Sequence, residues 1–313
     1  MEAILTSDYG APEVLSVGEF DTPKLNSNSV LVENHYFSVN PVDCGVRAGE
    51  YKLLSGKTVP SVLGADFSGV IKEIGENVTR FKVGDKVVGM LNPFKGGAYS
   101  QAVACPEHQI THAPSSIEYK KLAAMPLVSL TAYQALVKKV NLKAGETLVV
   151  NGATGGVGHV AIQLGKHIGA KVIAVCHPDQ SSIAYELGAD EVLSYKDDFL
   201  DEINNIDVFF DVSAMQKYKK IKSRLSSKGR YITTLPNAYT VLIAPLINKI
   251  SKQQNLFIGV KPRAKDLKVL VSWLEQGIFD VRVHQEYSMH NIKDAHKRMN
   301  QSGVIGKLIV STK

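Results

Sequence analysis

The sequence predicts a two-domain α/β protein in which a doubly wound parallel sheet follows a β-barrel-like region. Two observations carry this prediction. From residue 1 to about 120, short strand-like runs are broken by turn signals and show little helical periodicity. From Leu148 onward, apolar β-branched runs alternate with helical segments, at roughly one strand–helix unit every 20–25 residues. A length of 313 residues fits two domains of about 150 residues each.

Each element follows from its own pattern. Strands of the first half are expected around residues 30–33, 70–74 and 86–88. In the second half, strands are expected at 148–150, 172–175, 192–193, 208–210 and 231–233, with helices at 156–168, 180–187, 198–204 and 216–226. The alternation then stops, leaving a helix at 264–276, a strand at 281–285, a helix at 291–300 and a strand at 308–310. The predicted domains are therefore 1–122 with 260–313, and 123–259.

Composition excludes several classes of protein. With 44% hydrophobic and 21% charged residues, the chain is an ordinary globular one. The three cysteines lie too far apart for a disulfide framework or a clustered zinc site, which favours a reducing compartment and a cytoplasmic location. A net charge of +6 is too mild to indicate nucleic-acid binding. The longest apolar stretch, Val241–Ile247, is far shorter than the roughly 20 residues that a membrane span needs.

A turn of small residues follows the predicted strand that ends at Val150. Its members are Gly152, Ala153, Thr154, Gly155, Gly156, Val157 and Gly158. Gly155 and Gly158 fit the second and third glycines of a dinucleotide fingerprint, and Ala153 stands at the first. Small residues let the backbone approach a pyrophosphate, and the free N–H groups at the helix start bind the anion. The context of strand, turn and helix therefore predicts dinucleotide binding at residues 153–158.

The end of the next predicted strand bears on which dinucleotide binds. Where an acidic side chain would hold the adenosine 2′-hydroxyl, the chain has Cys176 followed by His177. A carboxylate there would repel a 2′-phosphate, so we expect NADPH rather than NADH, with positive charge from His177 or Lys196. Tyr218 and Lys222 also match the dyad of short-chain dehydrogenases. That reading is disfavoured, because in that family the glycine turn lies near the amino terminus and the dyad far downstream.

Several motifs along the whole chain point to one family. Asn40–Asp43 has the form Asn-x-x-Asp, and Gly64–Val70 has the form Gly-x-Asp-x-x-Gly-Val. Further motifs are Val83–Val87, Gly96–Ser100, Leu130–Tyr133, Gly188–Asp190 and Gly306–Lys307. Together they resemble the quinone oxidoreductase branch of the medium-chain dehydrogenase/reductases. The resemblance implies a GroES-like β-barrel catalytic domain, a Rossmann domain that binds NADPH, and a homodimer.

The resemblance also implies that zinc is absent. In the zinc alcohol dehydrogenases of this superfamily, a cysteine stands where Asn40 does and a His-Glu pair where Ala65 and Asp66 do. Another cysteine stands near Leu127 or Val128. The cysteine lobe of the structural zinc has no counterpart either, because Cys105 has no neighbour at Cys-x-x-Cys spacing.

Site residues are carried over from the family in the same way. Asn40, Asp43 and Tyr51 are the expected catalytic residues, and Gly45 stands where bacterial relatives carry a further tyrosine. Thr131 is expected near the nicotinamide and Tyr195 near the adenosine phosphate. An open α/β sheet binds its ligands at the carboxyl ends of its strands. These ends, together with the segment that follows the last predicted helix, supply the remaining candidates: Val212, Ser213, Thr234, Leu235, Phe257, Ile258, Gly306 and Lys307.

The absence of a Lewis acid restricts the chemistry that we expect. Reducing an isolated ketone needs strong stabilisation of the developing oxyanion, whereas a quinone or an α,β-unsaturated carbonyl delocalises that charge. The expected function is therefore NADPH-dependent reduction of one of these small molecules. A non-catalytic NADPH-binding protein and a zinc alcohol dehydrogenase are the alternatives. Val241–Ile247 is expected to form a helix or an interface, and the nearby Lys249 and Lys252 leave a membrane-surface contact open.

Overall fold

The computed structural model describes all residues from Met1 to Lys313, and the chain divides into two compact units. Unit 1 comprises Met1–Leu130, Lys261–Gln276 and Val281–Lys313, and unit 2 comprises Thr131–Val260 with Gly277–Asp280. The chain passes from the first unit to the second within α4 (Pro126–Tyr133). Residues 123–130 belong to unit 1, where the N–H of Leu127 donates to the Asp66 carboxylate at 2.8 Å.

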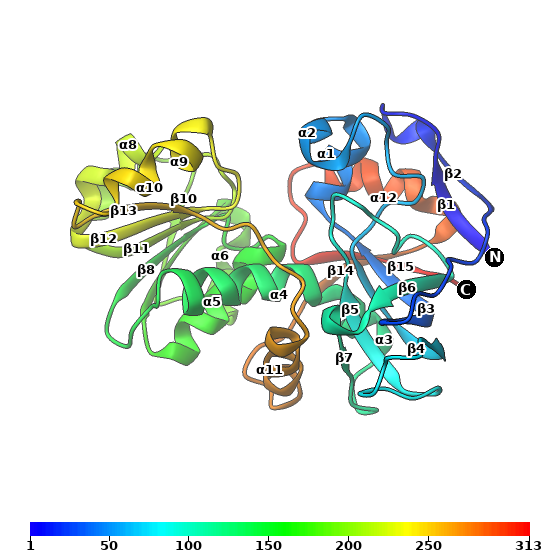
Figure 1. Cartoon of the computed structure of the whole chain (residues 1–313). Helices are drawn as coiled ribbons and strands as arrows, with labels where there is room; N and C mark the ends of the chain where they lie inside the picture. Colours follow the sequence, from blue (N-terminus) through cyan, green and yellow to red (C-terminus); the bar gives the residue numbers. More distant parts are fainter. The chain divides into compact units, whose positions relative to one another are not determined.

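Unit 2 is built on a six-stranded parallel sheet, labelled in Figure 1. Its strands are β8 (Thr147–Asn151), β9 (Lys171–Cys176), β10 (Glu191–Ser194), β11 (Ile206–Asp211), β12 (Leu225–Thr233) and β13 (Gln254–Phe257). Their order across the sheet is β10-β9-β8-β11-β12-β13, so the direction of winding reverses between β8 and β11. This confirms the predicted doubly wound sheet.

Helices cover both faces of this sheet. They are α5 (Gly156–Ile168), α6 (Ser181–Glu186), α7 (Phe199–Glu202), α8 (Tyr218–Ile221), α9 (Ala238–Leu242) and α10 (Ala244–Ile247). Figure 1 shows α5 on one face and α9 and α10 on the other. The central strands are apolar throughout because both faces are covered, and Val149, Val150, Phe209 and Phe210 are fully buried.

The predicted helix at 216–226 is wrong in its second half. The helix α8 stops at Ile221, a 3-10 turn spans Lys222–Arg224, and β12 already begins at Leu225. Leu225 is buried and pairs with Ile206 of β11, so sheet pairing overrides the helical pattern there.

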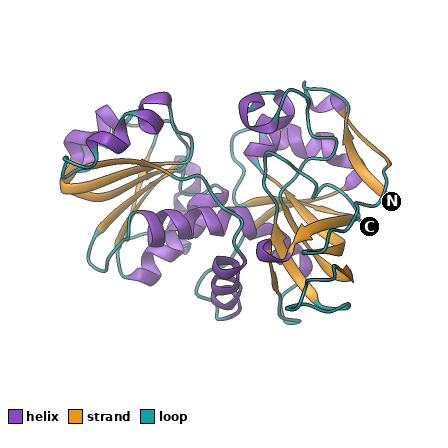
Figure 2. Cartoon of the chain, viewed as in Figure 1, coloured by secondary structure: helices purple, strands orange, loops and turns teal.

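Unit 1 is built on a two-stranded and a seven-stranded sheet, whose strands are orange in Figure 2. A hairpin pairs β1 (Glu2–Thr6) with β2 (Leu15–Glu19). The larger sheet runs β14-β15-β3-β4-β5-β7, and β6 pairs with β3. Its strands are β3 (Ser29–Val39), β4 (Asp66–Ile74), β5 (Lys86–Met90), β6 (Ala102–Pro106), β7 (Ile110–His112), β14 (Val283–Ser288) and β15 (Lys307–Ser311). The late strand β15 therefore lies inside the sheet, antiparallel to β3.

The helices of unit 1 are α1 (Pro41–Ala48), α2 (Lys52–Ser55), α3 (Tyr119–Ala124), α11 (Ala264–Glu275) and α12 (Ile292–Met299). Of these, α3, α11 and α12 pack on strands of the larger sheet, and α1 packs on α12. The first three helices, α1–α3, were not predicted. Pro41 occupies the first turn of α1, and the Asp43 carboxylate accepts the N–H of the capping residue Asn40 at 2.8 Å. The motif Asn-Pro-x-Asp is thus the start of a helix.

The three cysteines, Cys44, Cys105 and Cys176, are buried and form no disulfide. None of the helices has both the length and the apolar content needed to span a bilayer.

Candidate active site

The backbone requires two of the glycines in the turn after β8. Gly152 has φ +85°, a conformation that side chains other than glycine rarely adopt. A Cβ on Gly158 would lie 2.1 Å from the carbonyl oxygen of Gly152, so only glycine lets the first turn of α5 pack this closely on the strand. Ala153, between the two, is fully buried. These residues shape the turn.

Gly155 is different, because nothing in the protein requires a glycine there. Its φ is −72°, and a Cβ would meet no atom closer than 3.6 Å, an ordinary contact. The residue caps the amino end of α5, yet no side chain caps that end. Helix N–H groups that no side chain caps are what a pyrophosphate needs, and this position leaves them uncovered by a side chain. The turn therefore fits the phosphates of a dinucleotide.

The end of β11 lies beside this turn. The N–H groups of Val212 and Ser213 donate to the Asn151 carbonyl oxygen at 3.0 and 3.1 Å. The Asn151 amide in turn donates to Asp211 and to the Ser213 hydroxyl, both at 2.8 Å. Val212 and Ser213 are thus brought to the glycine turn, at the point where the winding of the sheet reverses.

The loop after β9 is tied to the same turn. The Thr154 hydroxyl donates to the side-chain carbonyl of Gln180. Cys176 is buried at the end of β9, and burial raises the pKa of its thiol to about 11. His177 follows, and its ring lies edge-on to that of Tyr195, with centroids 5.8 Å apart. The three residues predicted for the adenosine end therefore lie together.

The remaining candidates of unit 2 are spread more widely. Thr234, Leu235 and Ile258 follow the ends of β12 and β13, at the same edge of the sheet as the glycine turn. The N–H of Ile258 donates to the Thr233 carbonyl oxygen, and Leu235 is 55% exposed. Phe257 is half-buried at the end of β13, and Thr131 is buried within α4.

Unit 1 contains a buried polar cluster centred on Asn40. The Asn40 amide nitrogen donates to Asp66 at 2.9 Å and to Asp43 at 3.3 Å, and its amide oxygen accepts a hydrogen bond from the Lys307 ammonium group. That ammonium group lies 3.5 Å from the Asp66 carboxylate. All four side chains are buried. The fold thus brings together Asn40 and Lys307, which are 267 positions apart in the sequence.

The position of each partner follows from its backbone. Asp66 begins β4 and also accepts hydrogen bonds from the Ser38 hydroxyl at 2.6 Å and the Leu127 N–H at 2.8 Å. Lys307 begins β15. The preceding Gly306 has φ +78°, and a Cβ added there would lie 2.2 Å from the Arg282 carbonyl oxygen. Gly306 allows the close backbone contact with Arg282, and the Lys307 side chain that follows it is buried inside unit 1.

A second chain of hydrogen bonds leads away from Asp43. The Tyr99 hydroxyl donates to Asp43 at 3.1 Å and lies 3.2 Å from His296 Nε2, and the Cys44 thiol lies 3.4 Å from His296 Nδ1. Burial lowers the pKa of His296 to about 3, so the ring is neutral, and burial raises the pKa of Cys44 to about 12. Asp43 Oδ1 is buried without a partner.

Asp43→Asn is expected to flatten the pH dependence of stability. Burial raises the pKa of Asp43 from its usual 3.8 to about 7, so the folded protein binds this proton more tightly than the unfolded chain. The parent protein therefore loses stability as pH rises from about 4 through about 7. Asparagine does not titrate, so the variant should lack this loss when urea unfolding is measured at about pH 5 and about pH 8. Equal losses in both proteins would contradict the assignment.

Tyr51 lies outside this cluster. Its half-buried ring packs edge-on against Phe94, with centroids 5.6 Å apart. A Cβ on Gly45 would lie 2.4 Å from the Tyr51 ring, so the ring occupies the space that a side chain at position 45 would take. Burial raises the pKa of the Tyr51 hydroxyl, and the negative charge of the nearby Glu50 raises it further. It therefore stays protonated, as a hydrogen-bond donor.

Sequence reasoning assigned no role to several members of these clusters. Asp66 and Tyr99 lie within motifs that were recognised, whereas His296 and Asp211 carry no sequence signal that distinguishes them. Asp211 accepts hydrogen bonds from Asn151, Ser213 and Tyr231. Its position at the end of a buried strand is the only feature that could have pointed to it.

Known proteins share this architecture from end to end. The family of alcohol dehydrogenase GroES-like domains matches residues 26–115, and the zinc-binding dehydrogenase family matches residues 187–310. Human quinone oxidoreductase is 28% identical over 99% of this chain and 97% of its own length. The chloroplast envelope quinone oxidoreductase homolog of Arabidopsis thaliana is 29% identical over 99% and 98%. The structure of the Coxiella burnetii quinone oxidoreductase matches with a TM-score of 0.90 and 26% identity, over 100% of this chain and 99% of that one.

The chain belongs to the medium-chain dehydrogenase/reductase superfamily. The predicted Rossmann and GroES-like folds of this dehydrogenase/reductase are thereby confirmed. The zinc-binding dehydrogenase family is named for a metal ion. The buried cluster around Asn40 in unit 1 does not fit zinc. Zinc prefers cysteine, histidine and carboxylate ligands in a tetrahedron. Here the Asn40 amide and the Asp66 carboxylate contact a buried lysine, and no group of three or more His, Cys, Asp or Glu residues could hold a metal.

Proposed function

We propose that this dehydrogenase/reductase is a zinc-independent, NADPH-dependent oxidoreductase that transfers a hydride to a quinone or an α,β-unsaturated carbonyl. The observation that carries the proposal is the buried Lys307 ammonium group, which contacts Asn40 and Asp66. The positive charge of Lys307 compensates the negative charge of the buried Asp66 carboxylate, so no metal ion is needed to balance it. The relatives that match this chain over nearly their whole length are named quinone oxidoreductases, which supports the proposed class of substrate.

The turn from Gly152 to Gly158 is the proposed pyrophosphate site, and a nicotinamide dinucleotide bound there would supply the hydride. His177 and Tyr195 are the proposed contacts of the adenosine end, since no carboxylate follows β9 directly to repel a 2′-phosphate. Thr131, Val212, Ser213, Thr234, Leu235, Phe257 and Ile258 are the further proposed contacts of the cofactor.

In unit 1 we assign two different roles. Tyr51 is the proposed catalytic residue, because its hydroxyl stays protonated and makes no hydrogen bond within the chain. It can donate to the oxygen on which negative charge develops. Asn40 and Asp43 are proposed as positioning residues, since both are fully buried and the amide of Asn40 is bound on both sides. They hold the start of α1, the helix that precedes Tyr51.

The test measures cofactor oxidation with the purified protein. NADPH should be consumed with 1,4-quinones or with enones and enals, and NADPH should bind more tightly than NADH by fluorescence titration. A chelator should leave the rate unchanged, and elemental analysis should find much less than one zinc per chain. Tight NADPH binding without turnover of any substrate would favour a non-catalytic binding protein. One equivalent of tightly held zinc would contradict the proposal.

A further inference from the structure

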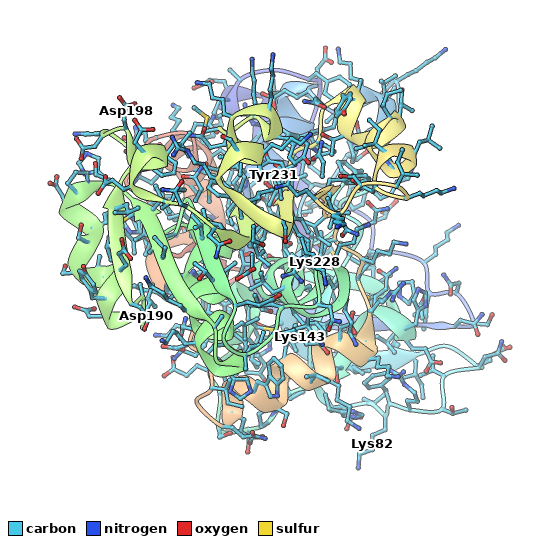
Figure 3. All side chains as sticks on the ribbon, turned by 90° about the vertical axis from the view of Figure 1, so that its left-hand side faces the viewer. Lys82, Lys143, Asp190, Asp198, Lys228 and Tyr231 are labelled. Atoms are coloured by element: carbon cyan, nitrogen blue, oxygen red, sulfur yellow. The ribbon has the colours of Figure 1, made fainter.

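Four buried side chains of unit 1 form a continuous series of hydrogen bonds. The Cys44 thiol lies 3.4 Å from His296 Nδ1, and His296 Nε2 lies 3.2 Å from the Tyr99 hydroxyl. That hydroxyl lies 3.1 Å from Asp43 Oδ2. Charged side chains of this protein generally lie at the surface, as Lys82 does in Figure 3, whereas Asp43 is fully buried. We call these four side chains the buried network, and both of its ends lie on α1.

One set of proton positions satisfies the buried network when Asp43 is ionised. An ionised carboxylate only accepts hydrogen bonds, so the Tyr99 hydroxyl donates to it. The hydroxyl oxygen then accepts from His296 Nε2–H, and His296 Nδ1 accepts from the Cys44 thiol. Burial lowers the pKa of His296 to about 3, so its ring is neutral and carries a single N–H proton. In this first arrangement the hydroxyl, the ring and the thiol each donate one proton to an acceptor.

The same atoms allow the opposite direction when Asp43 takes up a proton from solvent. A protonated Oδ2 donates to the Tyr99 hydroxyl oxygen, and the hydroxyl hydrogen turns toward His296 Nε2. The ring proton of His296 then lies on Nδ1 and is donated to the Cys44 sulfur. The thiol keeps an acceptor, because the His296 carbonyl oxygen lies 4.0 Å from Cys44 Sγ. In this second arrangement the network holds one proton more, and His296 has changed its tautomer.

Asp43 is the member of the buried network that takes up this proton. Its Oδ1 is buried without a partner, so the ionised form is incompletely hydrogen-bonded. Burial raises the pKa of Asp43 to about 7, the charge of Asp66 raises it as well, and the charge of Lys307 lowers it. A proton on Oδ1 would be a buried donor without an acceptor, whereas a proton on Oδ2 faces the Tyr99 hydroxyl. Proton uptake therefore favours Oδ2 and the second arrangement.

The surroundings of His296 and Cys44 favour the neutral form of both. Beside burial, the charge of Arg47 lowers the pKa of His296. Burial raises the pKa of Cys44 to about 12, the charges of Asp43 and Glu50 raise it as well, and Arg47 lowers it. The titratable side chains on the other elements packed against α12 are at least partly exposed: Glu13, Glu33, His35, Tyr36, His284, Glu286, Tyr287 and His290. His296 can therefore respond to Asp43 by changing its tautomer and not its charge.

We infer that Asp43, Tyr99 and His296 act as one unit, in which the charge of Asp43 sets the tautomer of His296. The Asn40 N–H donates to the same Oδ2 at 2.8 Å, so protonation of that oxygen weakens the cap of α1. Tyr99 and His296 are thus positioning residues that act on α1 through Asp43. The consequence for Tyr51, which follows α1, rests on the proposed function, whereas the unit itself does not.

Nuclear magnetic resonance of the uniformly 15N-labelled full chain tests this inference, because the 15N resonances of an imidazole distinguish its two tautomers. The signals of His296 among the nine histidines are those missing from His296→Gln. We expect the ring proton to move from Nδ1 to Nε2 between about pH 5 and about pH 9, with at least an about tenfold change in tautomer ratio. The Asn40 amide resonance should shift with the same midpoint. Neither readout needs cofactor or substrate, so failure here is distinguishable from failure of the proposed function.

Three variants separate the network from other causes of a pH response. Tyr99→Phe keeps the ring and removes the hydroxyl that links the two ends, so His296 should show one tautomer at both pH values. Asp43→Asn should have the same effect, because asparagine does not titrate. Tyr36→Phe is the matched control, since the Tyr36 hydroxyl also donates to a carboxylate of the same sheet, that of Glu286, at 3.2 Å. This control should keep the response of the parent protein.

The parent protein alone can overturn the inference, whether or not the variants fold. A single tautomer of His296 across this pH range would do so, as would a different midpoint for the Asn40 amide. The inference also fails if Tyr99→Phe melts like the parent protein and still shows the change of tautomer. The proton would then reach His296 without the Tyr99 hydroxyl.

Discussion

Gly155→Asp is expected to abolish dinucleotide binding and leave the protein folded. The backbone at Gly155 is extended, and a Cβ there meets no atom within 3.4 Å. Aspartate is a favoured residue at a helix N-cap and interacts well with the helix dipole, so stability should rise by about 0.5 kcal/mol. The same carboxylate would stand in the space proposed for a pyrophosphate. The dissociation constant for NADPH should therefore rise at least a hundredfold, equivalent to about 2.8 kcal/mol.

Fluorescence titration and thermal melting measure the two effects separately. Asn141→Asp is the matched control, because it adds the same charge in the loop before β8, at the opposite end of that strand. Its carboxylate can keep the hydrogen bond from Lys143 that Asn141 accepts at 2.8 Å. The control should bind NADPH like the parent. Tight binding by the Gly155 variant would show that the phosphates do not lie on this turn.

Lys307→Met is expected to be among the most destabilising single changes in unit 1. It leaves Asp66 fully buried without its cation, and removing one partner of a buried ion pair costs about 3–5 kcal/mol. Asp66→Asn in the same chain removes the uncompensated charge. The double variant should therefore recover much of the lost free energy of unfolding, as measured by urea denaturation.

Lys72→Met is the control for this pair. Lys72 and Glu33 approach to 2.6 Å, closer than Lys307 and Asp66, but both side chains are substantially exposed. An exposed ion pair contributes at most about 1 kcal/mol, so this change should have little effect. If Lys307→Met and Lys72→Met had similar effects, Lys307 would not compensate a buried charge.

Much of the fold was predictable, because its elements are long and strongly patterned. The apolar runs of β8, β9 and β11 and the helix α5 form where the periodicity predicts them. The errors fall where a tertiary contact outweighs local preference. Leu225 joins β12 because it pairs with Ile206, against the helical pattern of the residues before it.

The candidate site was predictable in part for the same reason. The glycine turn is a local motif, so its residues are contiguous and could be read directly. The buried cluster depends on register: Leu308 pairs with Val39, which brings Lys307 next to Asn40. No pattern within either segment specifies that pairing. His296 was missed because its contact with Cys44 exists only after α12 packs on α1. Tyr99 was missed because it reaches Asp43 from a segment 56 positions away.

The place of β15 within its sheet has a consequence for biosynthesis. Unit 2 is almost one continuous stretch of chain, so it can mature while the ribosome is still translating the carboxyl-terminal residues. Unit 1 cannot, because β15 completes the sheet between β14 and β3 and brings the lysine that compensates Asp66. Until β15 emerges, the nascent polypeptide carries an open strand edge and an uncompensated carboxylate. In a time course of translation, we expect protease resistance of the Rossmann half to appear first.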